Sequence, residues 1–155
     1  MLSYFLDVFL IQKCGLFISG GTGLVVVRAI ANLPSINSDF YRIHKGCFKG
    51  DLAIFQKVWL VRENRLATVG EMTAIGDNFS DERHQERLGV RLVKNTVEEI
   101  LAACDEMTAR LNGTWVTTEE DETLQKKYWD LICVSGHHGG RIGAQFLRDN
   151  QDLLR

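Results

Sequence analysis

The sequence lacks an excess of charge of either sign, and it contains no long apolar run. Its 155 residues include 18 Lys and Arg against 20 Asp and Glu, a formal net charge of −2. Without a basic surplus, the chain gives no electrostatic reason to expect nucleic-acid binding or a polybasic membrane anchor. The apolar opening, residues 1–11, has no basic n-region, contains Asp7 and is too short to cross a bilayer. We therefore expect a cytoplasmic protein, with the inner membrane face as a candidate place of work.

Motifs for metal binding, disulfide frameworks and nucleophilic catalysis are also lacking. No CxxC pair occurs among the four cysteines, so a ribbon-type zinc site has no support, and we expect buried thiols instead of disulfides. The sequence has no GxSxG, no HExxH and no Ser/His/Asp order. His137 and His138 are adjacent, a spacing that seldom lets two imidazoles face one metal, so solvated side chains are favoured there. His44 lies in a basic loop, where solvation is favoured over contact with a ligand phosphate.

The first forty residues alternate in the manner of a parallel α/β sheet. Leu2, Phe5, Leu6, Phe9 and Leu10 repeat at helical spacing and predict an amphipathic helix. A short apolar run, 15–19, predicts a buried strand, and 24–33 predicts a second helix that burial must stabilise because it is rich in Val and Ile. Pro34 ends that helix, and 35–38 predicts the next strand. No strand precedes the first helix, so the first strand of an ordinary α/β unit is missing.

Further elements are expected in the rest of the chain. The residues from 39 to 50 read as a long loop, and Asn95 with Glu98 has the spacing of a helix N-cap with its reciprocal acid. We expect strands at 52–55, 58–61 and 90–93, a turn at 62–65, and helices at 68–75, 95–111, from 118 onward and from about 141, with 76–87 a surface loop or short helix.

The segment Ser19-Gly20-Gly21-Thr22-Gly23 is the best candidate for a functional site. It follows a predicted strand and opens a predicted helix, where unpaired backbone N–H groups and the helix dipole attract an anion. Glycines let the main chain approach a phosphate closely, and the two hydroxyl groups add donors. The spacing matches neither the dinucleotide fingerprint nor the Walker loop. The segment thus predicts a phosphate site, and a turn that is glycine-rich for steric reasons alone is the alternative.

Three stretches together resemble one protein family. The first lies between Leu6 and Leu24 (LDVFLIQKC, FIS and GL), the second between Gly89 and Trp115 (GV, NT, EEI and RLNGTW), and the third is RIGAQFLRDN, residues 141–150. They are similar to segments of GT-B-type glycosyltransferases, in particular of a bacterial group associated with surface-carbohydrate biosynthesis. The resemblance covers most of the chain and is weakest from residue 35 to residue 67.

The resemblance implies a single Rossmann-like domain over residues 1–155 that matches the C-terminal, donor-binding half of such an enzyme. The expected fold is α/β, a mostly parallel sheet flanked by helices, incomplete at its N-terminal side. By motif position, Ser19 to Gly23 contact the donor pyrophosphate, and Asn37, just past the next strand, is a weaker candidate for the cleft. The terminal helix, within 136–155, is a candidate to pack on an absent N-terminal lobe.

The implied function is binding of a nucleotide sugar for transfer to a carbohydrate or lipid-linked acceptor in surface polysaccharide or glycoconjugate synthesis. Such enzymes stabilise the leaving diphosphate with a helix N-terminus and basic side chains, so neither a metal nor a cofactor is expected. The lobe that usually offers the catalytic base is absent, and catalysis by this chain alone is doubtful. The alternatives are a non-catalytic phosphate- or partner-binding half-domain and a structural domain. An incomplete domain is also expected to associate, with the missing lobe or as a homo-oligomer.

Overall fold

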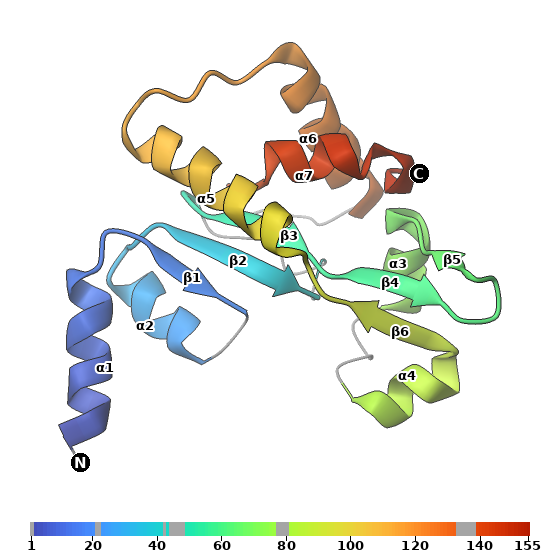
Figure 1. Cartoon of the computed structure of the whole chain (residues 1–155), viewed down its shortest axis with the longest axis horizontal. Helices are drawn as coiled ribbons and strands as arrows, with labels where there is room; N and C mark the ends of the chain where they lie inside the picture. The colour runs from blue at the N-terminus through green and yellow to red at the C-terminus, as the bar shows by residue number, and fades with distance from the viewer. Residues whose placement is uncertain (1, 21–22, 42, 44–48, 77–80, 133–138) are drawn as a thin grey trace.

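The fold was analysed in a computed structural model, which describes residues 2–20, 23–41, 43, 49–76, 81–132 and 139–155 (Figure 1). In chain order the elements are α1 (Leu2–Lys13), β1 (Phe17–Ser19), α2 (Leu24–Ile30), β2 (Ser35–Phe40), β3 (Leu52–Phe55), β4 (Lys57–Leu60), β5 (Arg65–Leu66), α3 (Val69–Ile75), α4 (Glu82–Leu88), β6 (Val90–Val93), α5 (Val97–Leu111), α6 (Glu119–Ile132), β7 (Arg141–Ile142), α7 (Ala144–Asp149) and a 3-10 turn (Gln151–Leu153).

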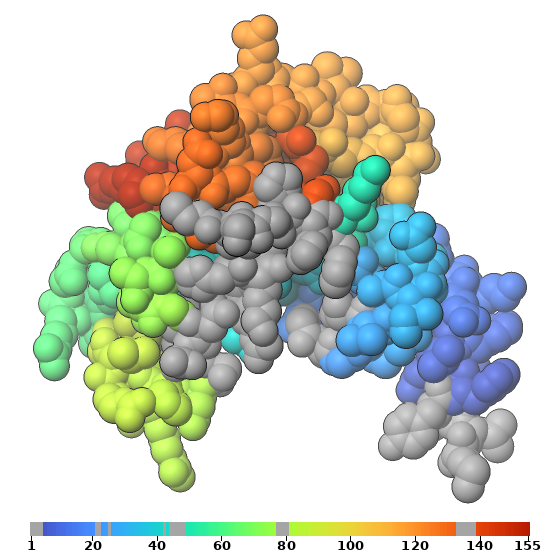
Figure 2. All heavy atoms as spheres, turned by 180° about the vertical axis from the view of Figure 1, so that it is seen from behind, coloured from blue at the N-terminus to red at the C-terminus, as the bar shows by residue number. Residues whose placement is uncertain are grey.

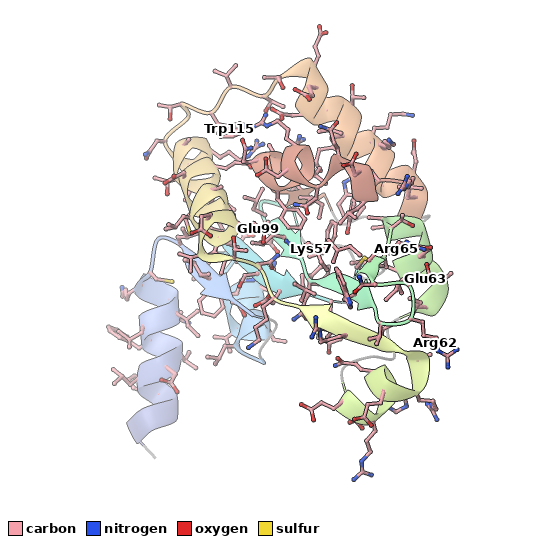
Figure 3. The ribbon with its side chains drawn as sticks, turned by 45° about the vertical axis from the view of Figure 1, so that its right-hand side comes forward. Lys57, Arg62, Glu63, Arg65, Glu99 and Trp115 are labelled. Carbon is pink, nitrogen blue, oxygen red and sulfur yellow. The ribbon has the colours of Figure 1, made fainter. Side chains whose placement is uncertain are left out.

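Four parallel strands form the main sheet, in the order β1-β2-β3-β7. All four residues of β3 are buried, as expected for a parallel strand that is covered on both faces. Figure 1 and the turned view of Figure 3 both place α5, α6 and α7 above this sheet and α1 and α2 below it. The expected α/β fold, a parallel sheet flanked by helices, is therefore confirmed.

Aromatic side chains pack α6 and α7 against the main sheet. The ring of Phe55, at the end of β3, stacks on Tyr128 of α6 with centroids 5.5 Å apart. It also meets the ring of Phe146 of α7 edge-on at 4.8 Å. All three side chains are buried, and such pairs add roughly 0.5–1.5 kcal/mol beyond the area that they bury. The terminal helix α7 thus packs against α5 and α6 of its own chain, and an additional contact with a second lobe stays a prediction.

The two edges of the main sheet differ. At the β7 edge, the side chain of Gln125 on α6 takes the place of a further strand: its Nε2 donates to the carbonyl of Ile142, and its Oε1 accepts from the Ile142 amide at 3.2 Å. At the other edge, β1 pairs with β2 alone among the described strands. Ile18 of β1 is 50 % exposed, so the expectation of a fully buried first strand is wrong at this residue.

A smaller antiparallel sheet, β5-β4-β6, extends from the carboxyl end of β3. Only Gln56 separates β3 from β4, and its amide donates to the carbonyl of Phe40 at 3.1 Å. The predicted turn at 62–65 joins β4 to β5, with Asn64 in the left-handed region at φ 54°. This sheet and α4, which contacts β6, therefore stand at the edge where the parallel strands end (Figure 1).

Capping residues explain where two of the helices begin. Thr68 and Glu71 form a capping box that starts α3, as the sequence predicted for Thr68. At α5 the box consists of Thr96 and Glu99, so the prediction of an Asn95–Glu98 pair is wrong by one residue. The Asn95 side chain accepts from another segment of the chain instead, as described below. Gly113, at φ 70°, follows the end of α5 at the predicted stop.

The structure corrects two further helix predictions. The last helix does not begin near Arg141, because Arg141 and Ile142 form β7 beside β3, and α7 starts at Ala144. A strand of two residues is too short to show a period in the sequence. The helix predicted for 24–33 ends at Ile30, which is 82 % exposed, so burial does not stabilise this end of the helix. Its buried side chain is Arg28, which pairs with Asp51.

Candidate phosphate-binding site

The pairing of β1 with β2 brings two of the sequence-predicted residues together. Ser19, the last residue of β1, is the register partner of Asn37 in β2, and both side chains are buried. The hydroxyl of Ser38 donates to the Ser19 carbonyl at 3.4 Å. In a parallel α/β sheet, ligands bind at the carboxyl ends of the strands, and Ser19 lies at the carboxyl end of β1, whereas β2 continues past Asn37 to Phe40. The two candidates therefore share one location.

The described part of the glycine turn is open to solvent. Gly20 and Gly23 are both exposed, and a Cβ added at either would meet no heavy atom within 4 Å. The Gly23 carbonyl accepts from the Val26 amide at 3.2 Å and so opens α2. Gly21 and Thr22 lie outside the described residues. At its described glycines, therefore, the turn is not sealed beneath other atoms.

The strand β2 is buried but polar, which is unusual for an inner parallel strand. Ser35, Asn37 and Ser38 are all buried, and Asn37 is 7 % exposed. The Asn37 side chain donates to the Ser35 hydroxyl at 3.4 Å, which is long for a hydrogen bond. The sequence analysis placed Asn37 just past this strand, but Asn37 lies within β2. Burying polar groups has a free-energy cost unless they find partners. These side chains therefore favour a binding site for a polar ligand at this edge of the sheet.

Asp39 and Asn95 clamp the end of β2 to the start of α5. The Asp39 amide donates to Asn95 Oδ1, and the Asn95 amide donates to Asp39 Oδ1, both at 2.7 Å. Asn95 Nδ2 also donates to the Phe55 carbonyl at the end of β3, at 3.1 Å. Asp39 takes a left-handed conformation, φ 50°, which is strained for a residue with a side chain. Two residues missed by the sequence prediction thus fix the ends of two strands.

A partly buried ion pair joins β4 to α5. Lys57, the first residue of β4, pairs with Glu99 of α5 (Figure 3). Its Nζ also lies 5.6 Å from the centroid of the Phe146 ring. Burial alone would raise the pKa of Glu99, but the hydrogen bonds from Lys57 and the Thr96 amide outweigh it and leave the pKa below its usual value. Glu99 is therefore a fixed anion that orients Lys57 at the carboxyl edge.

The sequence could have suggested the missed residues through one signal. Ser35 to Asp39 places four polar residues in a segment that the α–β order marks as an inner strand, and polar residues in such a strand suggest a site. Asn95 suggested a helix cap and not a site residue, because its position ahead of an acidic helix start is typical of an N-cap. The hydrogen bonds that it forms depend on residues far away in the sequence, so no local pattern predicts them.

The remaining candidates are placed as follows. His44, His137 and His138 lie outside the described residues. Among the residues that the structure describes, no group of three His, Cys, Asp or Glu could hold a metal ion. Within the same residues, none of the helices has both the length and the apolar character needed to cross a membrane.

Comparisons with models of protein families, with curated protein sequences and with solved structures find no match for this chain.

Proposed function

We propose that this chain is the nucleotide-sugar-binding domain of a glycosyltransferase of the GT-B type, with the donor diphosphate held at the turn from Ser19 to Gly23. The observation that carries the proposal is the pairing of Ser19, at the carboxyl end of β1, with Asn37 within β2, beside exposed glycines. Main-chain amides in a glycine turn can approach phosphate oxygens closely. The family resemblance of the sequence names the ligand class.

The surroundings of the turn support a preformed site. The Asp39–Asn95 clamp holds the ends of β2 and β3, and the partly buried Lys57–Glu99 pair joins β4 to α5, so the edge need not reorganise when a ligand binds. In this proposal Asn37 orients a polar group of the donor, and the turn carries the diphosphate. Stabilising the charge on the departing diphosphate is the contribution that such a domain makes to sugar transfer.

In the proposal, the rest of the reaction belongs to a second lobe. That lobe would hold a carbohydrate or lipid-linked acceptor and supply the base that removes a proton from the attacking hydroxyl. This chain alone is therefore expected to bind donor and to show no transfer. The surface polysaccharide or glycoconjugate that receives the sugar follows from the resemblance and not from any feature of the fold.

Titration calorimetry with UDP, GDP, ADP and CDP tests the proposal. We expect binding of at least one nucleotide and a loss of roughly tenfold or more in affinity in the Gly20→Val variant, because a branched side chain blocks the approach of the phosphates. Gly15→Val is the matched control: Gly15 lies at the opposite end of β1, and a Cβ there also meets no heavy atom within 4 Å. A folded chain that binds none of the four, or equal effects of the two substitutions, would contradict the proposal.

A further inference from the structure

One end of the molecule exposes apolar side chains from three consecutive elements. They are Phe5, Leu6, Val8, Phe9 and Leu10 on α1, Ile18 on β1, and Leu24, Val26 and Ile30 on α2. Figure 2 shows α1 and α2 as neighbouring projections at this end of the molecule, both in blue. No other part of the described chain exposes large apolar residues at this density, since the remaining six are spread from 61 to 116.

The apolar stripe of α1 faces away from the rest of the domain. With 100° of rotation per residue, Phe5, Leu6, Phe9 and Leu10 occupy one half of the helix surface, and Ile11 lies on roughly the opposite side. Ile11 is buried, whereas Phe5 is 74 % exposed. The rings of Phe5 and Phe9 stack on each other, 6.4 Å apart, along the exposed stripe. The amphipathic pattern of this helix therefore does not serve the core of its own domain.

The size of this surface fits a stable protein interface. Aromatic side chains bury about 150–250 Å², and with the lower end of that range as an average for Phe, Leu, Ile and Val the nine side chains offer roughly 750 Å². The largest apolar patch of a typical monomer is about 300–600 Å², and a standard interface takes about 800 Å² from each partner. Exposure of this extent to water is costly, and association with an equally apolar surface removes the cost.

The charges at this end favour a second copy of the same chain as the partner. The charged residues among 2–33 are Asp7, Lys13 and Arg28, and Arg28 is buried against Asp51. Asp7 lies off the stripe, and Lys13 lies at its end, with Nζ 5.9 Å from the centroid of the Phe9 ring. In an antiparallel pair of helices, the two copies of Lys13 stand at opposite ends of the interface, so no like charges meet. A parallel pair would bring them together.

We propose that two copies of this chain form a two-fold symmetric dimer through antiparallel packing of their α1 helices. Such an interface is self-complementary: Leu6 and Phe9 of one copy face Phe9 and Leu6 of the other, and Phe5 faces Leu10. The exposed residues of α2 extend the contact at its margin. The paired residues of α1 lie outside the glycine turn, which Ile18 and Leu24 adjoin, and the proposal does not depend on nucleotide binding.

Sedimentation velocity and light scattering over a wide dilution series test the dimer. We expect a mass of twice the chain mass of 17.5 kDa that falls toward the monomer on dilution. The Phe5→Glu/Leu10→Glu variant places like charges opposite each other and should dissociate. The Phe5→Lys/Leu10→Glu variant changes the same exposed positions but places opposite charges across an antiparallel interface. Its dimer should be at least tenfold tighter than that of the Glu/Glu variant. Val97→Glu and Val116→Glu, at exposed apolar residues elsewhere, should leave the mass unchanged.

Several outcomes would overturn the proposal. A wild-type chain that is monomeric at all concentrations excludes the dimer, and so does a Glu/Glu variant that dimerises as well as the wild type. Equal affinities of the Glu/Glu and Lys/Glu variants would exclude the antiparallel arrangement. A monomer that floats with phosphatidylcholine vesicles would show that the apolar end binds a lipid surface instead. Circular dichroism of every variant checks that the fold is intact, as expected for substitutions of exposed side chains.

Discussion

Asp39 and Asn95 each accept a hydrogen bond from the other's backbone amide, although 56 positions separate them in the sequence. The exchange ties the end of an inner strand to the residue before a helix cap. Because Asp39 is held at a positive φ, the pair also fixes a backbone conformation that an isolated aspartate would rarely take. The position of the whole carboxyl edge depends on these two side chains.

Replacing Asn95 should destabilise the fold. Asn95→Ala leaves the Asp39 amide and the Phe55 carbonyl without their side-chain partner, and we expect a loss of about 2–4 kcal/mol in the free energy of unfolding. Urea denaturation measures it. Asp39→Asn keeps an oxygen that accepts from the Asn95 amide, and asparagine tolerates a positive φ, so this control should lose less than about 1 kcal/mol. Equal losses in the two variants would show that the clamp does not act through these hydrogen bonds.

The Arg28–Asp51 pair gives a second stability prediction. Both side chains are buried, and two hydrogen bonds join the guanidinium to the carboxylate. Removing one partner, as in Asp51→Ala, takes the carboxylate away from a buried guanidinium and should cost about 3–5 kcal/mol. The double variant Arg28→Met/Asp51→Leu removes both charges and should lie closer to the wild type than either single variant. Thermal and urea unfolding of the wild type, both single variants and the double variant measure these losses. A double variant whose loss in the free energy of unfolding equals the sum of the two single losses would contradict the prediction.

The acid stability of the fold should depend on Glu71. The hydrogen bond from Arg65, followed by that from the Thr68 amide, lowers the pKa of Glu71 from 4.5 to about 2. A carboxylate with a lowered pKa stabilises the fold above the pKa of the unfolded chain, and that contribution is lost as the pH falls from about 4.5 to about 2. Urea midpoints across this window should fall more gently in Glu71→Gln. A Glu71→Gln variant with the same slope as the wild type would contradict this prediction.

Gly70 should tolerate no side chain. Its amide donates to the Arg155 carbonyl at 3.0 Å, and a Cβ at this position would lie 2.9 Å from the same oxygen. Although alanine favours a helix by about 1 kcal/mol over glycine, Gly70→Ala has to displace the backbone of Arg155, and we expect a net loss of about 1–2 kcal/mol. A Cβ at Gly15 meets no heavy atom within 4 Å, so the free energy of unfolding of Gly15→Ala should lie within about 0.5 kcal/mol of the wild-type value. A more stable Gly70→Ala would refute the contact.

The sequence predicted the elements whose patterns are local. The Thr68 cap, the strand from Val90 and the stop at Gly113 were all predicted correctly, because each depends on neighbouring residues only. Predictions that depended on distant partners were less accurate. In α5 the apolar Leu101 is exposed, whereas Glu106 is buried because it accepts from the Ala144 amide at the start of α7.

The same distinction holds for the candidate site. The glycine turn was visible in the sequence because its chemistry lies within five consecutive residues. The register that places Asn37 beside Ser19 depends on how β1 and β2 align, and the clamp depends on Asn95, which looked like an ordinary cap. The exposure of α1 could not be predicted either, since an amphipathic pattern shows that a helix has an apolar face and does not show what covers it.

The side chain of Gln125 also limits how large an assembly this sheet can enter. If both edges were bare, copies could add end to end and build an open filament. With the backbone groups of Ile142 already bonded to an amide of α6, further growth at that side has no template. Association through the opposite end therefore stops once that end is covered, and the product is a finite particle instead of a fibre.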